Sequence, residues 1–362
     1  MKKICLMFNH MQHQDGVCRS AIAIANMLTR KQLAEVTLIP LFTNDRAAYS
    51  LLEEGVKVRP AFGLWFTGFS RLVHRLPMSW LHRWFVGNDY DIEVAFQYGV
   101  SPRCIAAASR RSHASKYAWM HGYDEGLTLR RAYEAIGTVV CVSRCNAERL
   151  HKELPTIKVD YNYNPIDDAS VRRFGAETAD IERPSDGLLM VSVGRLSPEK
   201  GFSRLFEQLK RLKGDGYNFH FWMIGDGPLR QQLEQQAQQL GLHEQVAFLG
   251  RQSNPHRYTA QADLFVCSSF TEGYSTACTE AIMLDVPVLT TSVSGAKEII
   301  DEADCGMLVD MDDESLYQGL KQILSNPTII GEWKQRLLET RKRFSAEERI
   351  KRLIRLFGLE KA

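Results

Sequence analysis

Two glutamates eight positions apart give the strongest chemical signal in the chain. Glu272 and Glu280 lie in the segment SSFTEGYSTACTE, residues 268–280. The apolar run before this segment predicts a strand that ends near residue 268, and we expect a helix from about Ser275, which leaves Glu272 on the turn and Glu280 inside the helix. The N–H groups at a helix start form a site for a phosphate. We therefore expect a phosphate there, a sugar hydroxyl at Glu272 and a ribose at Glu280. Two solvated glutamates beside a capped helix also explain the pair when it is taken alone.

A second loop carries two cations that suit the same ligand. Arg195 and Lys200 lie in VGRLSPEKGF, residues 193–202, which again leaves an expected strand and enters an expected helix. Two cations that converge on one point stabilise a diphosphate leaving group as its bond to the sugar breaks, and they do so in place of a metal. A surface loop with two solvated charges explains this motif equally well when it is taken alone.

A third loop, GDGPL at residues 225–229, also follows an expected strand. Its glycines permit a tight turn at the carboxyl edge of the sheet, and Gly225 is a candidate for binding the same ligand. By itself this signal is weak, because most such turns are only turns.

The three loops sit in a pattern of short apolar runs that alternate with stretches of helical periodicity. This pattern predicts βαβ units, hence an α/β fold with parallel sheets. In the first half we expect strands at residues 3–8, 35–41, 91–96, 117–120 and 139–142. In the second half we expect them at residues 188–193, 219–224, 246–249, 264–268, 286–290 and 307–309.

The chain of 362 residues suits two packed α/β domains. We expect the first Rossmann-like domain at residues 1–165 and the second at residues 188–340. The stretch 166–187 is polar, contains prolines and has no periodicity, so we interpret it as a linker. The amphipathic tail, residues 341–362, is expected to be helical and to return to the first domain.

Composition excludes several classes of function. The formal net charge is only +2, so the chain has no uniform basic field for nucleic acid. No apolar run is long enough for a membrane-spanning helix, and the N-terminal residues read as a buried strand rather than a signal peptide. The eight cysteines are scattered, which favours reduced thiols in the cytosol. The first strand lacks the GxGxxG fingerprint of a nicotinamide dehydrogenase.

The three loops together resemble glycosyltransferase family 4, of the kind that builds bacterial capsule, O-antigen or lipopolysaccharide sugars. GRLSPEKG, GDGPL and EGYSTACTE occur in the family's order and spacing. The resemblance implies a GT-B fold, in which two Rossmann-like domains face each other across a cleft. It also implies a retaining transfer from a nucleotide diphosphate sugar, with UDP as the expected nucleotide, and no metal or other cofactor.

Site roles follow from the resemblance residue by residue. Arg195 and Lys200 would bind the diphosphate, Glu272 the donor sugar and Glu280 the ribose. The implied neighbours of the donor's sugar, phosphate and base are Gly273, Tyr274, Ser275, Gly225 and Arg251.

In the first half, His121 follows an expected strand, and the resemblance implies that it faces the donor sugar. A satisfied structural histidine is the alternative for a lone residue of this type. The loop QHQDGVCR, residues 12–19, has one glycine where the family often has two. Gly16 either lets the backbone approach the donor phosphate or simply starts a helix.

The segment from Phe62 to Phe85 is crowded with aromatic residues, Arg and His and contains no acid. Such a segment suits an anionic membrane surface, and a core helix with a solvated basic face is the equal alternative. We expect a cytoplasmic enzyme, with the inner face of the membrane as its place of work. Its partners would be a nucleotide sugar and a lipid-linked saccharide acceptor.

Other functions remain open at this point. A GT-B nucleotide-sugar epimerase or a disaccharide phosphorylase would use similar loops. A sugar-nucleotide binding subunit without catalysis is disfavoured, because Arg195, Lys200, Glu272 and Glu280 are all present.

Overall fold

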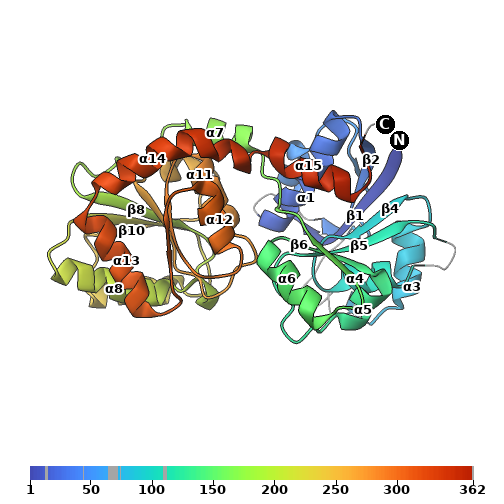
Figure 1. Ribbon diagram of the computed structural model, residues 1–362, viewed down its shortest axis with the longest axis horizontal. Coiled ribbons are helices and arrows are strands. Elements are labelled where there is room, and N and C mark those ends of the chain that lie inside the picture. Colours follow the sequence, from blue (N-terminus) through green and yellow to red (C-terminus); the bar gives the residue numbers. More distant parts are fainter. Residues whose placement is uncertain (13–14, 44, 64–71, 74, 109–111, 361–362) are drawn as a thin grey trace. The chain divides into compact units, whose positions relative to one another are not determined.

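The computed structural model describes residues 1–12, 15–43, 45–63, 72–73, 75–108 and 112–360. The chain forms two compact units (Figure 1). Unit 1 comprises Met1–Ile166 together with Ala346–Ala362, and unit 2 comprises Asp167–Ser345.

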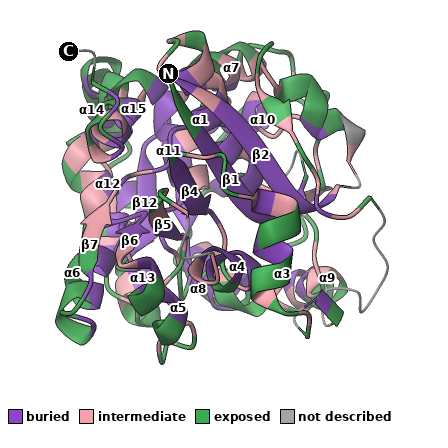
Figure 2. Ribbon diagram, turned by 90° about the vertical axis from the view of Figure 1, so that its right-hand side faces the viewer, coloured by how far each residue is buried: buried purple, intermediate pink, exposed green. Residues whose placement is uncertain are grey.

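Unit 1 is built on a parallel sheet in the order β3-β2-β1-β4-β5-β6-β7. The strands are β1 (Lys2–Met11), β2 (Ala34–Thr43), β3 (Lys57–Val58), β4 (Ile92–Ala95), β5 (Ser115–Met120), β6 (Thr138–Cys141) and β7 (Lys158–Tyr161). The helices include α1 (Gly16–Arg30), α3 (Met78–Leu81), α4 (Val100–Ala106), α5 (Arg130–Ile136), α6 (Arg144–Glu153) and α15 (Ala346–Leu356). Strands β2 and β4 are buried along almost their whole length (Figure 2), as is typical of strands that lie between two helical layers.

Unit 2 repeats the design with the order β10-β9-β8-β11-β12-β13. Its strands are β8 (Leu188–Val193), β9 (Phe219–Ile224), β10 (Val246–Gly250), β11 (Leu264–Cys267), β12 (Val288–Thr291) and β13 (Met307–Val309). Its main helices are α7 (Asp168–Gly175), α8 (Phe202–Gly214), α9 (Arg230–Gln239), α10 (His256–Thr259), α11 (Thr276–Met283), α12 (Ala296–Ala303), α13 (Asp313–Ser325) and α14 (Thr328–Thr340). Helices α8 and α13 pack together on one face, and α11 and α12 cover the other (Figure 1).

These sheets confirm the predicted pair of Rossmann-like folds. The bounds of β8, β9 and β13 agree with the sequence prediction residue for residue. Two edge strands were not predicted: β3 has only two residues, and β7 reads Lys-Val-Asp-Tyr, with no fully buried residue. Edge strands of this kind lack the apolar run by which a buried strand is recognised.

The predicted linker at residues 166–187 is wrong in its first half. Helix α7 begins here, capped by the Asp167 carboxylate, which accepts from Ser170 N at 3.0 Å. Val171 is buried, and α7 packs against α10 and α11. The helix has one buried apolar residue among charged neighbours, so its periodicity is too weak to be recognised. Unit 2 also extends to residue 345 rather than 340.

Helix α15 belongs to unit 1, where charged and polar side chains attach it. Arg352 donates from Nε to the Tyr161 carbonyl and from Nη2 to Asp160, both at 2.5 Å. At the end of the helix, Lys2 Nζ donates to the Phe357 carbonyl at 2.9 Å. The last segment of the chain is therefore part of the fold that begins with β1.

His121 follows β5 and links three parts of unit 1. Its Nε2 donates to the Phe96 carbonyl at 2.8 Å, and its Nδ1 accepts from the Asn164 amide at 3.1 Å. The Phe96 ring meets the imidazole edge to face, with 4.8 Å between centroids. Burial lowers the pKa of His121 to about 4, so the ring is neutral near pH 7.

We predict that His121 makes the protein less stable in acid. In the unfolded chain a histidine takes up its proton near pH 6.5, whereas the folded ring resists protonation until about pH 4. The unfolded state therefore binds more protons between these values, and stability falls as the pH falls through this window. Glutamine cannot take up that proton. The melting temperature of His121→Gln should fall less steeply from pH 6.5 to 4 than that of the wild type, with parallel curves above pH 7. Identical slopes in the acid window would contradict this reading.

Candidate donor-sugar site in unit 2

The candidate site lies where the strand order of unit 2 reverses. Strands β8 and β11 are neighbours, paired at Met190 with Leu264 and at Val191 with Phe265, although about 70 residues separate them. Crossover connections leave such neighbouring strands in opposite directions, and ligands bind in the crevice at their carboxyl ends. The loop after β8 carries Arg195 and Lys200, and the loop after β11 carries Glu272. The parallel pairing therefore brings two of the predicted motifs to one place.

Backbone contacts join these two loops closely. Phe270 N donates to the Glu199 carbonyl at 2.7 Å, and the Ser268 hydroxyl donates to the Lys200 carbonyl at 2.9 Å. Gly201 has a φ of +66°, and a Cβ at this position would lie 2.2 Å from the Ser268 carbonyl oxygen. Glycine is therefore required here for conformation and for space.

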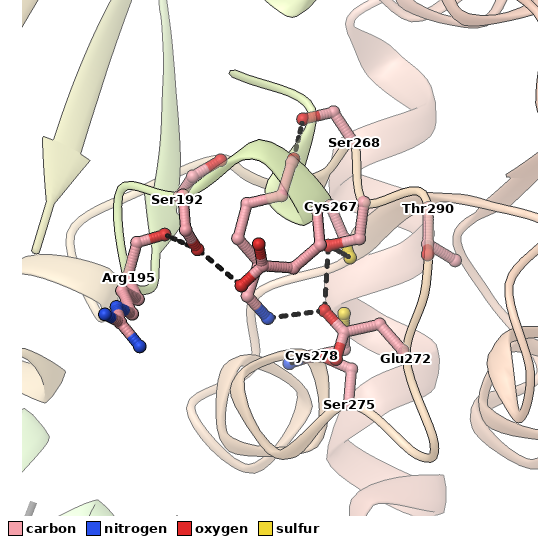
Figure 3. Close-up of polar contacts among 12 residues, drawn as sticks. Ser192, Arg195, Cys267, Ser268, Glu272, Ser275, Cys278 and Thr290 are labelled. Carbon is pink, nitrogen blue, oxygen red and sulfur yellow. Dashed lines mark hydrogen bonds and ion pairs between the residues drawn. The ribbon is translucent and has the colours of Figure 1, made fainter. Parts of the chain in front are cut away.

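The charged centre of the site is an ion pair. Lys200 Nζ donates to Glu272 Oε1 at 2.7 Å, and the Ser269 hydroxyl donates to the same oxygen at 2.8 Å (Figure 3). The two charged side chains are 26% and 15% exposed. Burial alone would lower the pKa of Lys200, but the charge and the hydrogen bond of Glu272 raise it instead. The ammonium is thus held charged in a half-buried position that a ligand can reach.

Arg195 does not converge with Lys200 in this structure. It is exposed, and Figure 3 shows its guanidinium apart from the Glu272 carboxylate. Within the part of the chain that the structure describes, its side chain makes no hydrogen bond or ion pair. The carboxylate of the neighbouring Glu199 accepts a hydrogen bond from the Ser197 hydroxyl at 2.5 Å. This bond lowers the pKa of the Glu199 carboxyl. Arg195 can therefore turn toward a phosphate without giving up another partner.

The turn and helix around the two glutamates have the predicted form. Helix α11 begins after Ser275, whose hydroxyl caps it by accepting from Cys278 N at 3.3 Å. Glu272 lies on the turn, and Glu280 lies within the helix with a side chain that is 14% exposed. Gly295 packs closely against this turn. A Cβ at position 295 would lie 2.9 Å from both the Gly273 carbonyl oxygen and the Tyr274 ring, so only glycine leaves enough space.

His256 is a neighbour of Glu280 that the sequence did not reveal. Its Nδ1 lies 4.0 Å from Glu280 Oε2, and the histidine is 4% exposed. The Phe174 ring from α7 stacks on it, with 6.4 Å between centroids. A single histidine in an otherwise ordinary polar stretch carries no sequence signal, so only the fold connects His256 with the site.

The glycines of the third loop bring it against the first. A Cβ on Gly225 would lie 1.8 Å from the Gly194 carbonyl oxygen, and one on Gly227 would lie 2.4 Å from that of Leu196. Leu196 N donates to the Asp226 carbonyl at 3.0 Å. The structure thus gives Gly225 a packing role that shapes the Arg195 loop, and its contact with a donor stays a prediction. Arg251 follows β10 and is exposed.

A pair of thiols lies directly behind the ion pair (Figure 3). Cys267 ends β11 and contacts the Ser269 hydroxyl at 3.6 Å. A hydrogen bond from Cys278 lowers the pKa of Cys267 to about 6, although burial works in the opposite direction. Both cysteines are buried and unbridged.

In unit 1, Gly16 lies at the start of a helix, which is the second of the two alternatives stated for this residue. This residue begins α1, and the Asp15 carboxylate caps the helix by accepting from Cys18 N at 2.8 Å. Gly16 therefore starts a helix, while a backbone contact with a donor phosphate stays a prediction. His121 has protein partners at both ring nitrogens, which favours the structural alternative for this residue.

The aromatic and basic segment from Phe62 to Phe85 is described only in part, and Trp65, Phe66, Phe69 and Arg71 lie outside the described residues. In the described part, Trp80 and Trp84 are 44% and 59% exposed, with 6.0 Å between their ring centroids. Beneath them, His82 and Glu93 form a buried pair at 2.9 Å. The segment is thus anchored to the core while both indoles face outward.

Two features are absent from the described residues. These residues contain no cluster of three or more His, Cys, Asp or Glu side chains that could hold a metal ion. Among the helices they form, none has the length and apolarity needed to cross a membrane.

Comparison with known proteins assigns the chain to a family. The model of the family "Glycosyl transferases group 1" matches residues 175–357. The lipopolysaccharide core biosynthesis glycosyltransferase LpsD of Rhizobium meliloti is 30% identical over 331 residues, which cover 90% of this chain and 89% of LpsD. An alpha-1,4-N-acetyl-D-galactosaminyltransferase of Campylobacter jejuni, whose name gives a saccharide on PP-undecaprenol as acceptor, is 31% identical over 86% of each chain.

Solved structures share the fold at low sequence identity. HepE of Anabaena in complex with UDP-glucose aligns with a TM-score of 0.74 at 18% identity, over 99% of this chain and 100% of HepE. WaaG, a glycosyltransferase involved in lipopolysaccharide biosynthesis, aligns with a TM-score of 0.72 at 16% identity, over 98% of this chain and 99% of WaaG. These likenesses show the GT-B fold. From the family match and its relatives, the chain belongs to the group 1 glycosyl transferases.

Proposed function

We propose that this glycosyltransferase moves a sugar from a UDP-sugar to a lipid-linked saccharide, with retention of anomeric configuration and without a metal. The product would be a cell-surface polysaccharide of the capsule, O-antigen or lipopolysaccharide type. The observation that carries the proposal is the Lys200–Glu272 ion pair at the reversal of strand order, with Arg195 exposed on the same loop. UDP and UDP-glucose complexes of HepE support the donor, and the Campylobacter relative supports a lipid-linked acceptor.

In the proposed complex, the donor diphosphate replaces Glu272 as the partner of Lys200. Arg195 turns onto the same diphosphate, so that two cations stabilise the charge that develops on the leaving group. The carboxylate of Glu272, relieved of the ammonium, accepts a hydrogen bond from a hydroxyl of the transferred sugar. Glu280, inside α11 and next to His256, accepts from the ribose. Thus one ion pair separates into a phosphate contact and a sugar contact.

Loss of either cation should reduce turnover strongly. We expect Arg195→Ala and Lys200→Ala each to lower kcat by roughly 10²-fold, the scale of one lost electrostatic contact to developing charge. Lys321→Ala is the matched control, because this lysine of α13 pairs with Asp215 instead. Release of UDP from UDP-sugars is the assay, with product anomers assigned by NMR. Activity should survive EDTA, and complete loss that manganese restores would refute the metal-independent account.

The two glutamates should differ in their effect on free UDP. Glu280→Gln should weaken UDP binding by about 1–3 kcal/mol, the value of a hydrogen bond to a charged group. Glu272→Gln should leave UDP affinity equal or make it tighter, because it removes the carboxylate that competes with the diphosphate for Lys200. Titration calorimetry with UDP measures both. Equal losses in the two variants would show that the assignment is wrong.

We further propose that the enzyme works at the cytoplasmic face of the membrane. It docks there through α3 and the short π-helix η2 (His82–Val86) that follows it. Trp80 and Trp84 expose their rings there, and Arg75 and Arg83 are exposed beside them. Indole rings are stable among lipid head groups, and each basic residue near an anionic surface adds about 1 kcal/mol. An anionic bilayer complements both features.

Vesicle sedimentation tests this docking. The protein should pellet with anionic vesicles at low salt, less at high salt, and little with neutral vesicles, because salt screens the attraction. Trp80→Ala combined with Trp84→Ala and Arg83→Gln should abolish pelleting and leave UDP release unchanged. Arg130→Gln, an exposed residue of α5 in unit 1, is the control. If the wild type pellets with neither kind of vesicle, the surface serves another purpose.

A further inference from the structure

Arg204, in the first turn of α8, is buried beside the site with unusual partners. It is 8% exposed, and its guanidinium donates to backbone carbonyls rather than to a carboxylate. Nε and Nη2 reach the Ser268 carbonyl at 3.1 and 2.6 Å, Nη2 also reaches that of Ser269 at 3.2 Å, and Nη1 reaches that of Met311 at 2.5 Å. A buried charge is costly unless its donors are satisfied, so this set of four bonds is a strong constraint on the three carbonyls.

The carbonyls that Arg204 holds belong to the turn that carries Glu272. Ser269 donates its hydroxyl to Glu272, and Ser268 donates its hydroxyl to the Lys200 carbonyl. One serine therefore connects Arg204 with each member of the ion pair: Ser269 with Glu272, and Ser268 with Lys200. The Ser269 carbonyl also accepts from the Thr291 hydroxyl at 2.6 Å, so the turn is held from two sides.

Phe270 covers the guanidinium from the solvent side. The Arg204 carbon Cζ lies 4.0 Å from the ring centroid, and the ring is itself 50% exposed. A planar cation beneath an aromatic face adds attraction and excludes water from the hydrogen bonds below. The Phe270 amide is used as well, in its bond to the Glu199 carbonyl. Side chain and backbone of this residue thus connect the two loops of the site.

We propose that Arg204 is a positioning residue for sugar transfer. It fixes the turn 268–272, so that Glu272 reaches the transferred sugar while Lys200 binds the diphosphate. It acts through the backbone and touches no substrate. The inference rests on the proposed roles of Lys200 and Glu272. A loosened turn would leave the ribose contact of Glu280 in place, because that residue is held by α11. It would misplace the sugar contact of Glu272, while Lys200, on the loop after β8, would keep its contact with the diphosphate.

The test compares Arg204→Met and Arg204→Lys with Arg211→Met. Arg211 lies on the same helix and also stacks on an aromatic ring, 3.7 Å from the Tyr317 centroid, but it bonds to Gln208 and Glu314. We expect both Arg204 variants to lower kcat by about 10- to 100-fold, since small misplacements of reacting groups have effects of this size. Lysine should not rescue, because one ammonium cannot span three carbonyls. Affinity for UDP should change less than about 2-fold, and Arg211→Met should behave as wild type.

Hydrogen exchange gives a second measurement, independent of activity. Peptides that cover residues 268–275 should exchange faster in the Arg204 variants than in Arg211→Met, at temperatures well below melting. Wild-type kcat in folded Arg204→Met, or in Arg204→Lys if the Met variant does not fold, would overturn the inference. A parallel loss of kcat and UDP affinity with general faster exchange would do so too, because it indicates a purely structural residue. Lys200→Ala is measured alongside: normal turnover in that variant would instead refute the proposed function.

Discussion

Lys200 and Glu272 are 72 residues apart in the chain, and their ion pair forms only where the loops after β8 and β11 meet. Much of the architecture of unit 2 serves that meeting. Adjacent parallel strands bring the loops to one edge, Gly201 allows the Ser268 carbonyl to approach, and Arg204 holds the turn from beneath. A half-buried pair of charges is stable only when both partners are present, because removal of one leaves the other poorly solvated. The site therefore needs a carboxylate or an equivalent anion beside Lys200 at all times.

In the proposed complex, this requirement gives the pair a role in donor binding. A diphosphate can replace the carboxylate as the anion at Lys200 without leaving the ammonium unpaired, and the displaced Glu272 finds a sugar hydroxyl. The exchange conserves the number of charged contacts, so the cost of breaking the pair is offset within the same step. Free nucleotide without a sugar satisfies Lys200 but leaves Glu272 with only the Ser269 hydroxyl. Under the proposed roles, the arrangement thus favours an intact UDP-sugar over its product.

The sequence was sufficient to predict those parts of the site that depend on local pattern. The spacing of Glu272 and Glu280 predicted a turn and a helix, and α11 with its Ser275 cap has that form. The apolar runs predicted β8 and β9 residue for residue. These features are encoded by neighbouring residues, so the chain order alone reveals them.

Features that depend on contacts between distant segments were not predicted. Arg204 reads as one of several cations on the polar side of an amphipathic helix, and only the fold shows that it is buried under Phe270. His256 carries no local signal, and α7 was interpreted as a linker because it buries one apolar residue. The convergence of Arg195 with Lys200 was inferred from shared loop position, yet in this structure Lys200 is bonded to Glu272 while Arg195 is exposed.

The most direct measurement is a crystal structure of the chain with an intact UDP-sugar, in which the partners of Lys200 Nζ are identified. The account predicts that Nζ lies about 3 Å from a phosphate oxygen, that the 2.7 Å contact with Glu272 is broken, and that the carboxylate accepts from a sugar hydroxyl. A bound donor with the Lys200–Glu272 pair intact, and with no phosphate oxygen within reach of Nζ, would contradict it.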